Sequence, residues 1–312
     1  MIDSKEEVVM LLLSAFKTRY PDGAQSFGSD ALYQTVRRGN TRLLELLAEN
    51  VDLIGTVIED DGSNEPRYSL PDVVFTSPLG EAVRQHAENK GTGRALEHLL
   101  PLVKDLNAVV HKTYKQGYMT SLLYAISLGS LATVQKLYQA GADIKFPAEW
   151  QIKRTPLQAA SEAGSKDIVE YLLHEGASPD EPPAVNAGAT ALQLAAIKGN
   201  IGVVEILRDA GADINAPPAF CDGRTAFEGA TEHGRLEMMI FLVDHGANLL
   251  ANNGAQYRRA VEFAEDNHQH AAKELANKLY EKALAEEGML SVDMGVGAWA
   301  GGDVTILEDL LQ

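Results

Sequence analysis

Two consecutive segments in the middle of the chain decide its fold: Thr190–Asn200 reads TALQLAAIKGN, and Ile201–Asn215 reads IGVVEILRDAGADIN. Each carries apolar residues at the three- and four-residue spacing of an amphipathic helix. A glycine follows each apolar run, Gly199 in the first segment and Gly211 in the second. Glycine adopts the left-handed conformation that ends a helix at little cost. We therefore expect two short helices followed by a polar turn.

The same pattern recurs with a spacing of 35 residues. A threonine opens each copy, a glycine ends its first helix, and a glycine followed by alanine ends its second helix. These positions are Thr120, Thr155, Thr190 and Thr225; Gly129, Gly164, Gly199 and Gly234; and Gly141, Gly176, Gly211 and Gly246. Internal repeats of roughly 20–50 residues indicate a solenoid, in which each unit buries its apolar stripe against its neighbours.

This unit resembles the ankyrin repeat, and the match is close over residues 119–249. The resemblance implies an all-α solenoid of helix–turn–helix units joined by finger-like turns. The sequence departs from the family at the histidine that usually follows Thr-Pro-Leu, because Leu123, Gln158, Gln193 and Glu228 stand there. We expect another group to supply the hydrogen bond that this histidine makes between turns.

Weaker copies extend the array in both directions to about seven units. Ser77 opens a copy with insertions, residues 32–47 hold an earlier copy, and Arg259–Tyr280 forms a degenerate last copy. Before the array, Ser4-x-x-Glu7 is a capping-box pattern that predicts a helix. We therefore expect three parts: an N-terminal helix or cap over 1–28, the repeat array over 29–280, and a C-terminal tail over 281–312.

Composition restricts the kind of partner. The 312 residues include 44 acidic and 27 basic side chains, which gives a net charge of −17 at pH 7. Such a chain repels nucleic acid and anionic lipid, so we expect neither as a direct partner. A single cysteine excludes an internal disulfide framework and fits a reducing compartment. The acidic first residues do not resemble a secretory signal, so we expect the protein in the cytoplasm or the nucleus.

The sequence shows no pattern of a catalytic, cofactor or metal site. It lacks a phosphate-binding glycine loop and a His-Glu-x-x-His motif. His268 and His270 are two residues apart, so they do not share a helix face, and no third ligand accompanies them. Cys221 stands beside Asp222, whose charge opposes formation of a thiolate. We therefore expect a protein that is not an enzyme and has no cofactor.

Candidate binding residues lie in the fingers and on the inner face of the expected solenoid. The repeat has 35 residues, against about 33 in the common unit, and the two extra residues lie in the finger. The tip of the finger keeps an apolar residue in three successive repeats, at Trp150, Val185 and Phe220. Either these tips pack on the next finger, or they form a contact stripe. The repeat register places a second set on the inner face: Met119, Leu128, Arg154, Ile197, Lys198, Arg224, Glu232 and His233. Exposed apolar and cationic side chains on a concave wall suit a protein partner.

The tail combines glycines with a high apolar content. Trp299 is its largest apolar side chain, and Leu307, Leu310 and Leu311 form one stripe of a short helix. A helix this short is marginal alone in water, so we expect the tail to dock on the repeats through these residues. Alternatively, Leu307–Leu311 is a free acidic docking motif.

We interpret the sequence as a non-enzymatic scaffold or adaptor that binds another protein through its concave face and fingertips. The acidic chain suits a partner with a basic or mixed apolar surface. The long proline-containing fingers, such as Ala216-Pro217-Pro218, resemble those of fungal ankyrin modules, which often end larger regulatory proteins. Two alternatives stay open: an enzyme or small-molecule binder that uses the groove with the tail as a lid, and a transcriptional regulator that docks through the tail.

Overall fold

The structure is a computed structural model, and it describes most of the expected array. The described residues are 29–48, 74–89, 91, 93–113, 117–149, 151–185 and 188–295, with Val8, Leu11, Leu12, Ser14, Ala15, Val51, Leu53, Ile54, Val57 and Ile58. Side chains are described as far as Gly288. The five described residues of the expected N-terminal cap are helical.

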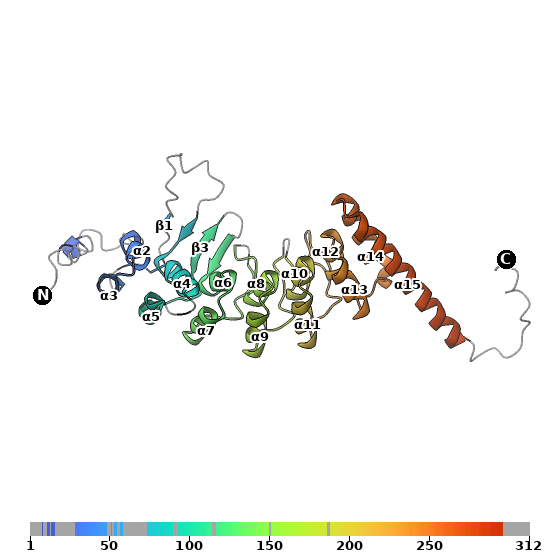
Figure 1. Ribbon diagram of the computed structural model, residues 1–312, viewed down its shortest axis with the longest axis horizontal. Helices are drawn as coiled ribbons and strands as arrows, with labels where there is room; N and C mark the ends of the chain where they lie inside the picture. Colours follow the sequence, from blue (N-terminus) through green and yellow to red (C-terminus); the bar gives the residue numbers. More distant parts are fainter. Residues whose placement is uncertain are drawn as a thin grey trace, which may run out of the picture.

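Seven helix pairs follow one another along the long axis of the described chain (Figure 1). The first helices of the pairs are α2 (Ser29–Arg37), α4 (Pro78–Glu88), α6 (Ser121–Ser127), α8 (Pro156–Ala163), α10 (Ala191–Lys198), α12 (Ala226–Glu232) and α14 (Ala251–Asp266). The second helices are α3 (Thr41–Ala48), α5 (Arg94–Leu99), α7 (Leu131–Gln139), α9 (Lys166–His174), α11 (Ile201–Asp209), α13 (Leu236–Asp244) and α15 (His270–Gly295). We number the repeats one to seven by these pairs, and the expected count of about seven units is confirmed.

In repeats three to six a threonine caps the start of the first helix, and in α8 and α10 a left-handed glycine ends it. At the start of α8, the Thr155 hydroxyl accepts a hydrogen bond from the Gln158 amide, and the Gln158 side chain accepts one from the Thr155 amide at 3.1 Å. This reciprocal pair is a capping box. Gly164 then ends the helix with a φ of 75°. Gly199 and Gly211 have φ values of 82° and 95°, so they are left-handed as the sequence predicts.

A glutamine supplies the contact between repeats that the absent histidine leaves open. In α8, Gln158 Nε2 donates to the carbonyl oxygens of Glu181 and Pro182 at 3.1 and 3.2 Å. These carbonyls belong to the finger that leads into α10. In α10, Gln193 Nε2 donates to two carbonyls of the following finger at 2.9 and 3.0 Å. One side chain therefore caps its own helix and holds the next finger.

Short polar side chains link successive fingers at their bases. The Asp213 amide donates to Asp180 Oδ1 at 3.0 Å, and the Asn248 amide donates to Asn215 Oδ1 at 2.9 Å. Both bonds join residues 33 positions apart. Each finger base is therefore tied to the finger before it as well as to its own helix.

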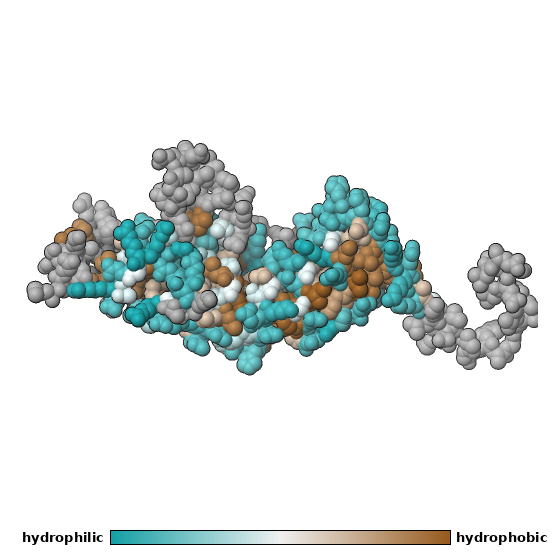
Figure 2. Space-filling model, viewed as in Figure 1, coloured by the Kyte–Doolittle hydropathy of each residue, from teal (hydrophilic) through white to brown (hydrophobic). Residues whose placement is uncertain are grey.

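The apolar core runs without interruption from repeat one to repeat seven. Small side chains lie between the first helices, where Ala160, Ala195 and Ala230 are fully buried. Because alanine is small, α8, α10 and α12 approach one another closely. In Figure 2 most of the visible surface is hydrophilic, and a hydrophobic patch lies over repeats six and seven. Leu236 and Ile240 of α13 are exposed, at 38% and 42%.

A four-stranded antiparallel sheet joins the finger between repeats one and two to the finger between repeats two and three, and the sequence pattern does not predict it. Thr76 Oγ1 and His111 Nδ1 lie 2.8 Å apart across two of its strands, and His111 stacks on Tyr124 of α6. Within the long interval between Ser77 and Thr120, residues 109–113 and 117–120 therefore pair as strands. The strands pair in chain order: β1 (Val57–Ile58), β2 (Phe75–Thr76), β3 (Val109–Thr113) and β4 (Gly117–Thr120).

The last repeat ends in a longer helix than the repeat pattern implies. One helix, α15, crosses the boundary expected between residues 280 and 281 and continues to Gly295. Its segment 281–287 (EKALAEE) consists of strong helix formers, so the helix propagates beyond residue 280. Its partner α14 is interrupted by three left-handed residues at 252–254. The tail residues Trp299, Leu307, Leu310 and Leu311 lie outside the described residues.

We predict that Gly211→Val lowers the free energy of unfolding by about 1–2 kcal/mol, because a branched side chain is strained in left-handed backbone. No atom lies within 4 Å of the added Cβ, so the loss reports backbone strain alone. At Gly199 the Cβ also meets Arg235 Cδ at 3.0 Å, so Gly199→Val should cost at least as much. Urea titration measures both variants.

Gly211→Asn is the matched control, since asparagine tolerates the left-handed conformation better than other residues. Its urea midpoint should stay closer to that of the wild type. Equal midpoints for wild type and both valine variants would contradict the repeat register assigned to these glycines.

Candidate functional site

Ion pairs and apolar residues alternate along the face formed by the first helices. Arg154, just before α8, donates from Nε to Glu162 Oε2 at 2.8 Å. Two repeats later, Arg224 Nε donates to Glu232 Oε2 at the same distance. The repeat between them has Ile197 at the position of the glutamate. In each charged repeat, the arginine and the glutamate eight residues later therefore satisfy one another.

The residues that the register assigns to the inner face differ in exposure. Met119 is buried, with 9% of its surface exposed. Leu128 and Ile197 are half-buried, while Lys198 and His233 are exposed. The register therefore does not tell which of these side chains reach solvent.

This face is hollowed between repeats three and five into a pocket of about 450 Å³. Met119 and Leu123 of repeat three form part of its apolar lining. Arg154, Glu162 and Lys198 line its polar side. Glu162 serves both cations, because its Oε1 lies 3.7 Å from Lys198 Nζ while its Oε2 accepts from Arg154.

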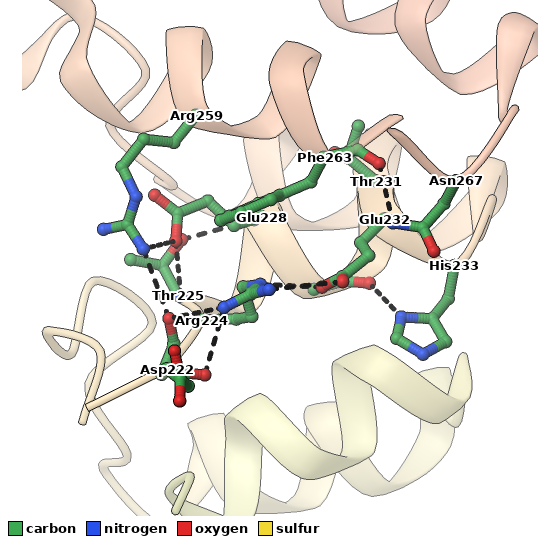
Figure 3. A network of polar contacts seen from close by, with 12 residues as sticks. Asp222, Arg224, Thr225, Glu228, Thr231, Glu232, His233, Arg259, Phe263 and Asn267 are labelled. Atoms are coloured by element: carbon green, nitrogen blue, oxygen red, sulfur yellow. Dashed lines mark hydrogen bonds and ion pairs between the residues drawn. The ribbon is translucent and has the colours of Figure 1, made fainter. Parts of the chain in front are cut away.

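The second ion pair lies in a dense polar network between repeats six and seven (Figure 3). The Arg224 guanidinium carbon lies 3.8 Å from the centre of the Phe263 ring of α14. Arg259 approaches the same ring at 5.5 Å, donates to the Gly223 carbonyl at 3.2 Å, and pairs with Glu228 at 3.4 Å. Arg224 is therefore held on two sides, by a carboxylate and by an aromatic ring.

The two described fingertips present apolar side chains to solvent. Val185 is 68% exposed and Phe220 is 92% exposed. The tips touch through the backbone, where the Cys221 amide donates to the Val185 carbonyl at 3.3 Å. Gly223 closes the second tip so tightly that an added Cβ would lie 2.2 Å from a backbone nitrogen four residues earlier. Trp150, the third tip residue of the sequence prediction, lies outside the described residues.

Glu228 occupies the position that Gln158 and Gln193 take in the two preceding repeats. Its carboxylate is 1% exposed and accepts a hydrogen bond from the Thr225 amide at 3.0 Å. Burial raises the pKa of Glu228, although the bond from Thr225 and the charge of Arg259 oppose the shift. A carboxyl with a raised folded pKa removes stability as pH rises from the ordinary value, about 4.3, through the folded value.

The described chain offers neither a metal site nor a membrane span. Among those residues, no group of three or more His, Cys, Asp or Glu side chains is placed to hold a metal ion. Over the same part of the chain, no helix combines the length and the apolar content needed to cross a bilayer.

We predict that Glu228→Gln raises the urea midpoint at pH 7 and gains on the order of 1 kcal/mol, the net value of one satisfied amide contact. Glutamine keeps the acceptor for Thr225 and carries no buried charge. It gives up the ion pair with Arg259, but that side chain is 41% exposed, so solvent screens the pair and hydrates the cation after the change. The difference from wild type should shrink as pH falls toward 4, where Glu228 is protonated. Glu237→Gln, an exposed change of equal charge on α13, is the control. If the urea midpoints of wild type and Glu228→Gln differ by the same amount at every pH between 4 and 7, the buried-charge explanation is wrong.

Known proteins share this repeat. The family model described as "Ankyrin repeats (3 copies)" matches residues 79–183 and 181–253, which together exceed half of the chain. The structure is similar to the crystal structure of the human ASB11 ankyrin repeat domain, with a TM-score of 0.53 and 22% sequence identity. That match covers 78% of this chain and 96% of the other, and at this identity it shows the fold alone. No curated protein sequence matches the chain. The repeat pattern, the stacked helix pairs and the family match together show that the chain belongs to the ankyrin-repeat family.

Proposed function

We propose that the protein is a non-enzymatic scaffold or adaptor that binds another protein through its concave face and its fingertips. Ankyrin repeats are generally protein–protein interaction modules. The observation that carries the proposal is the exposure of Phe220, at 92%, on a tip that neighbours the exposed Val185. Large apolar side chains that stay in water on a folded surface favour contact with a partner.

The construction of the fingers supports a binding role. Pro217 and Pro218 precede the tip that carries Phe220, and proline restricts the backbone before binding. The tight turn at Gly223 restricts it from the other side. A surface that is already rigid loses less conformational entropy when a partner binds.

Charge and composition support the choice of partner and compartment. With a net charge of −17, the chain attracts a protein that presents a basic or mixed apolar surface. The single cysteine supports a place in the cytoplasm or the nucleus. The long proline-containing fingers, such as Ala216-Pro217-Pro218, support a relationship to fungal ankyrin modules. Docking of the tail through Trp299, Leu307, Leu310 and Leu311 stays a prediction.

We predict that the combined change Trp150→Ser, Val185→Ser and Phe220→Ser abolishes partner binding and leaves the helical circular dichroism near wild type. The side chains removed at the two described tips make little contact with the core, so the fold has little to lose. The test is affinity capture with the wild-type chain, followed by direct binding of the captured protein to each variant.

Ile240→Ser is the matched control, because Ile240 is an exposed apolar residue on the second helix α13, away from the fingertips. This variant should keep the partner. Loss of the partner from Ile240→Ser, together with its retention by the triple variant, would move the contact to the outer helices and contradict the proposal.

A further inference from the structure

The pocket on the concave face has a charge opposite to that of the chain. Three cationic side chains line it, Lys153, Arg154 and Lys198, against one carboxylate, Glu162. The chain as a whole carries 17 more negative than positive charges. A local excess of cations on so acidic a molecule forms a small region to which an anion is attracted.

The cations of the pocket are not fully used by the protein itself. Arg154 is engaged by Glu162 and by the Lys153 carbonyl. Lys198 Nζ lies 3.7 Å from Glu162, beyond hydrogen-bond distance, and its side chain is 47% exposed. Lys153 is exposed at the rim. An ammonium group has three donors, so Lys198 retains capacity for a further acceptor.

Apolar residues lie next to these cations. Met119, Leu123 and Ile152 line the pocket and are 9%, 4% and 7% exposed. Ala159 of α8 is half-buried there, and its short side chain leaves space beside them. Tyr118 also lines the pocket. A pocket of this size, about 450 Å³, has room for an apolar side chain and part of the backbone that carries it.

We propose that this pocket binds a short segment of a partner protein in which an apolar side chain stands next to a carboxylate. The apolar side chain lies against Met119 and Leu123, and the carboxylate meets Lys198 and Arg154. Because the remainder of the chain is acidic, a monoanionic carboxylate is repelled less than a doubly charged group would be. This inference rests on the proposed function and names the chemistry that one part of the concave face recognises.

The acidic surroundings give the pocket selectivity. A partner with a wholly acidic surface is repelled by the net charge, and a wholly basic segment is repelled by the lining of the pocket. The partner that fits both therefore has a basic or mixed surface with one acidic, apolar segment. That combination is consistent with the surface proposed for the partner as a whole.

The test uses the full chain and a fluorescent eight-residue peptide with blocked ends, in which one leucine–glutamate pair is flanked by glycine and serine. Two twins replace the glutamate by lysine or the leucine by serine. Fluorescence anisotropy should show binding of the leucine–glutamate peptide and at least about tenfold weaker binding of each twin, since a lost charge contact or apolar contact is worth roughly that factor. Binding of the leucine–glutamate peptide should weaken as salt is added.

Two variants assign the binding to the pocket. Lys198→Glu reverses the available cation, and Ala159→Phe fills the space beside the apolar lining without changing charge. Each variant should bind the leucine–glutamate peptide about tenfold or more weakly than wild type does. Lys278→Glu, an equal charge change at an exposed site on α15, should stay within about twofold of wild type. Circular dichroism confirms that each variant is folded.

Three results would overturn the inference. The first is equal binding of the lysine twin, and the second is unchanged binding by both pocket variants. The third is that the leucine–glutamate peptide binds only to a full chain that carries Glu308→Lys and Asp309→Lys. The tail of the wild-type chain would then occupy the pocket and exclude the peptide. If the fingertip variant loses the partner while the pocket variants bind it and the peptide as wild type does, the proposed function stands and this inference fails.

Discussion

The array depends on one side chain that makes two kinds of hydrogen bond at once. In α8 and α10, the glutamine at the third helical position accepts from the backbone of its own cap and donates to carbonyls of the next finger. Both ends are buried, so a shift in register would leave polar groups without partners. In these two repeats, the position of the following finger and of its tip therefore follows from the start of the helix before it.

Most of the fold can be predicted from the sequence because its determinants are local. A threonine that caps and a glycine that turns left act within a few residues, and their 35-residue period is directly visible at positions such as Thr190 and Gly199. The sheet depends instead on pairing between β2 and β3, which Thr76 and His111 join across 35 residues. A two-residue strand has no periodicity of its own, so this part of the fold is absent from the sequence pattern.

The site is only partly predictable for a related reason. Register places Arg154 and Arg224 on one face, but it does not indicate that each pairs with a glutamate eight residues later. The contact of Arg224 with Phe263 crosses from repeat six to repeat seven and depends on how the degenerate last repeat packs. The sequence also does not decide whether the fingertips pack on the next finger or form a contact stripe. The exposure of Val185 and Phe220 depends on the geometry of the turns, which the residue pattern does not specify.

Glu228 stands where the two preceding repeats have a glutamine, and this difference makes the junctions between repeats unequal in strength. Within repeats four to six, neutral amide bonds hold the fingers, whereas the ion pair of Glu228 with Arg259 contributes to the junction with the last repeat. Stability in a solenoid is approximately a sum over neighbouring junctions, and ions in the solvent weaken charged junctions most. We therefore expect the molecule to fray from its C-terminal end, with α14 and α15 separating as one cooperative unit while the central repeats stay folded.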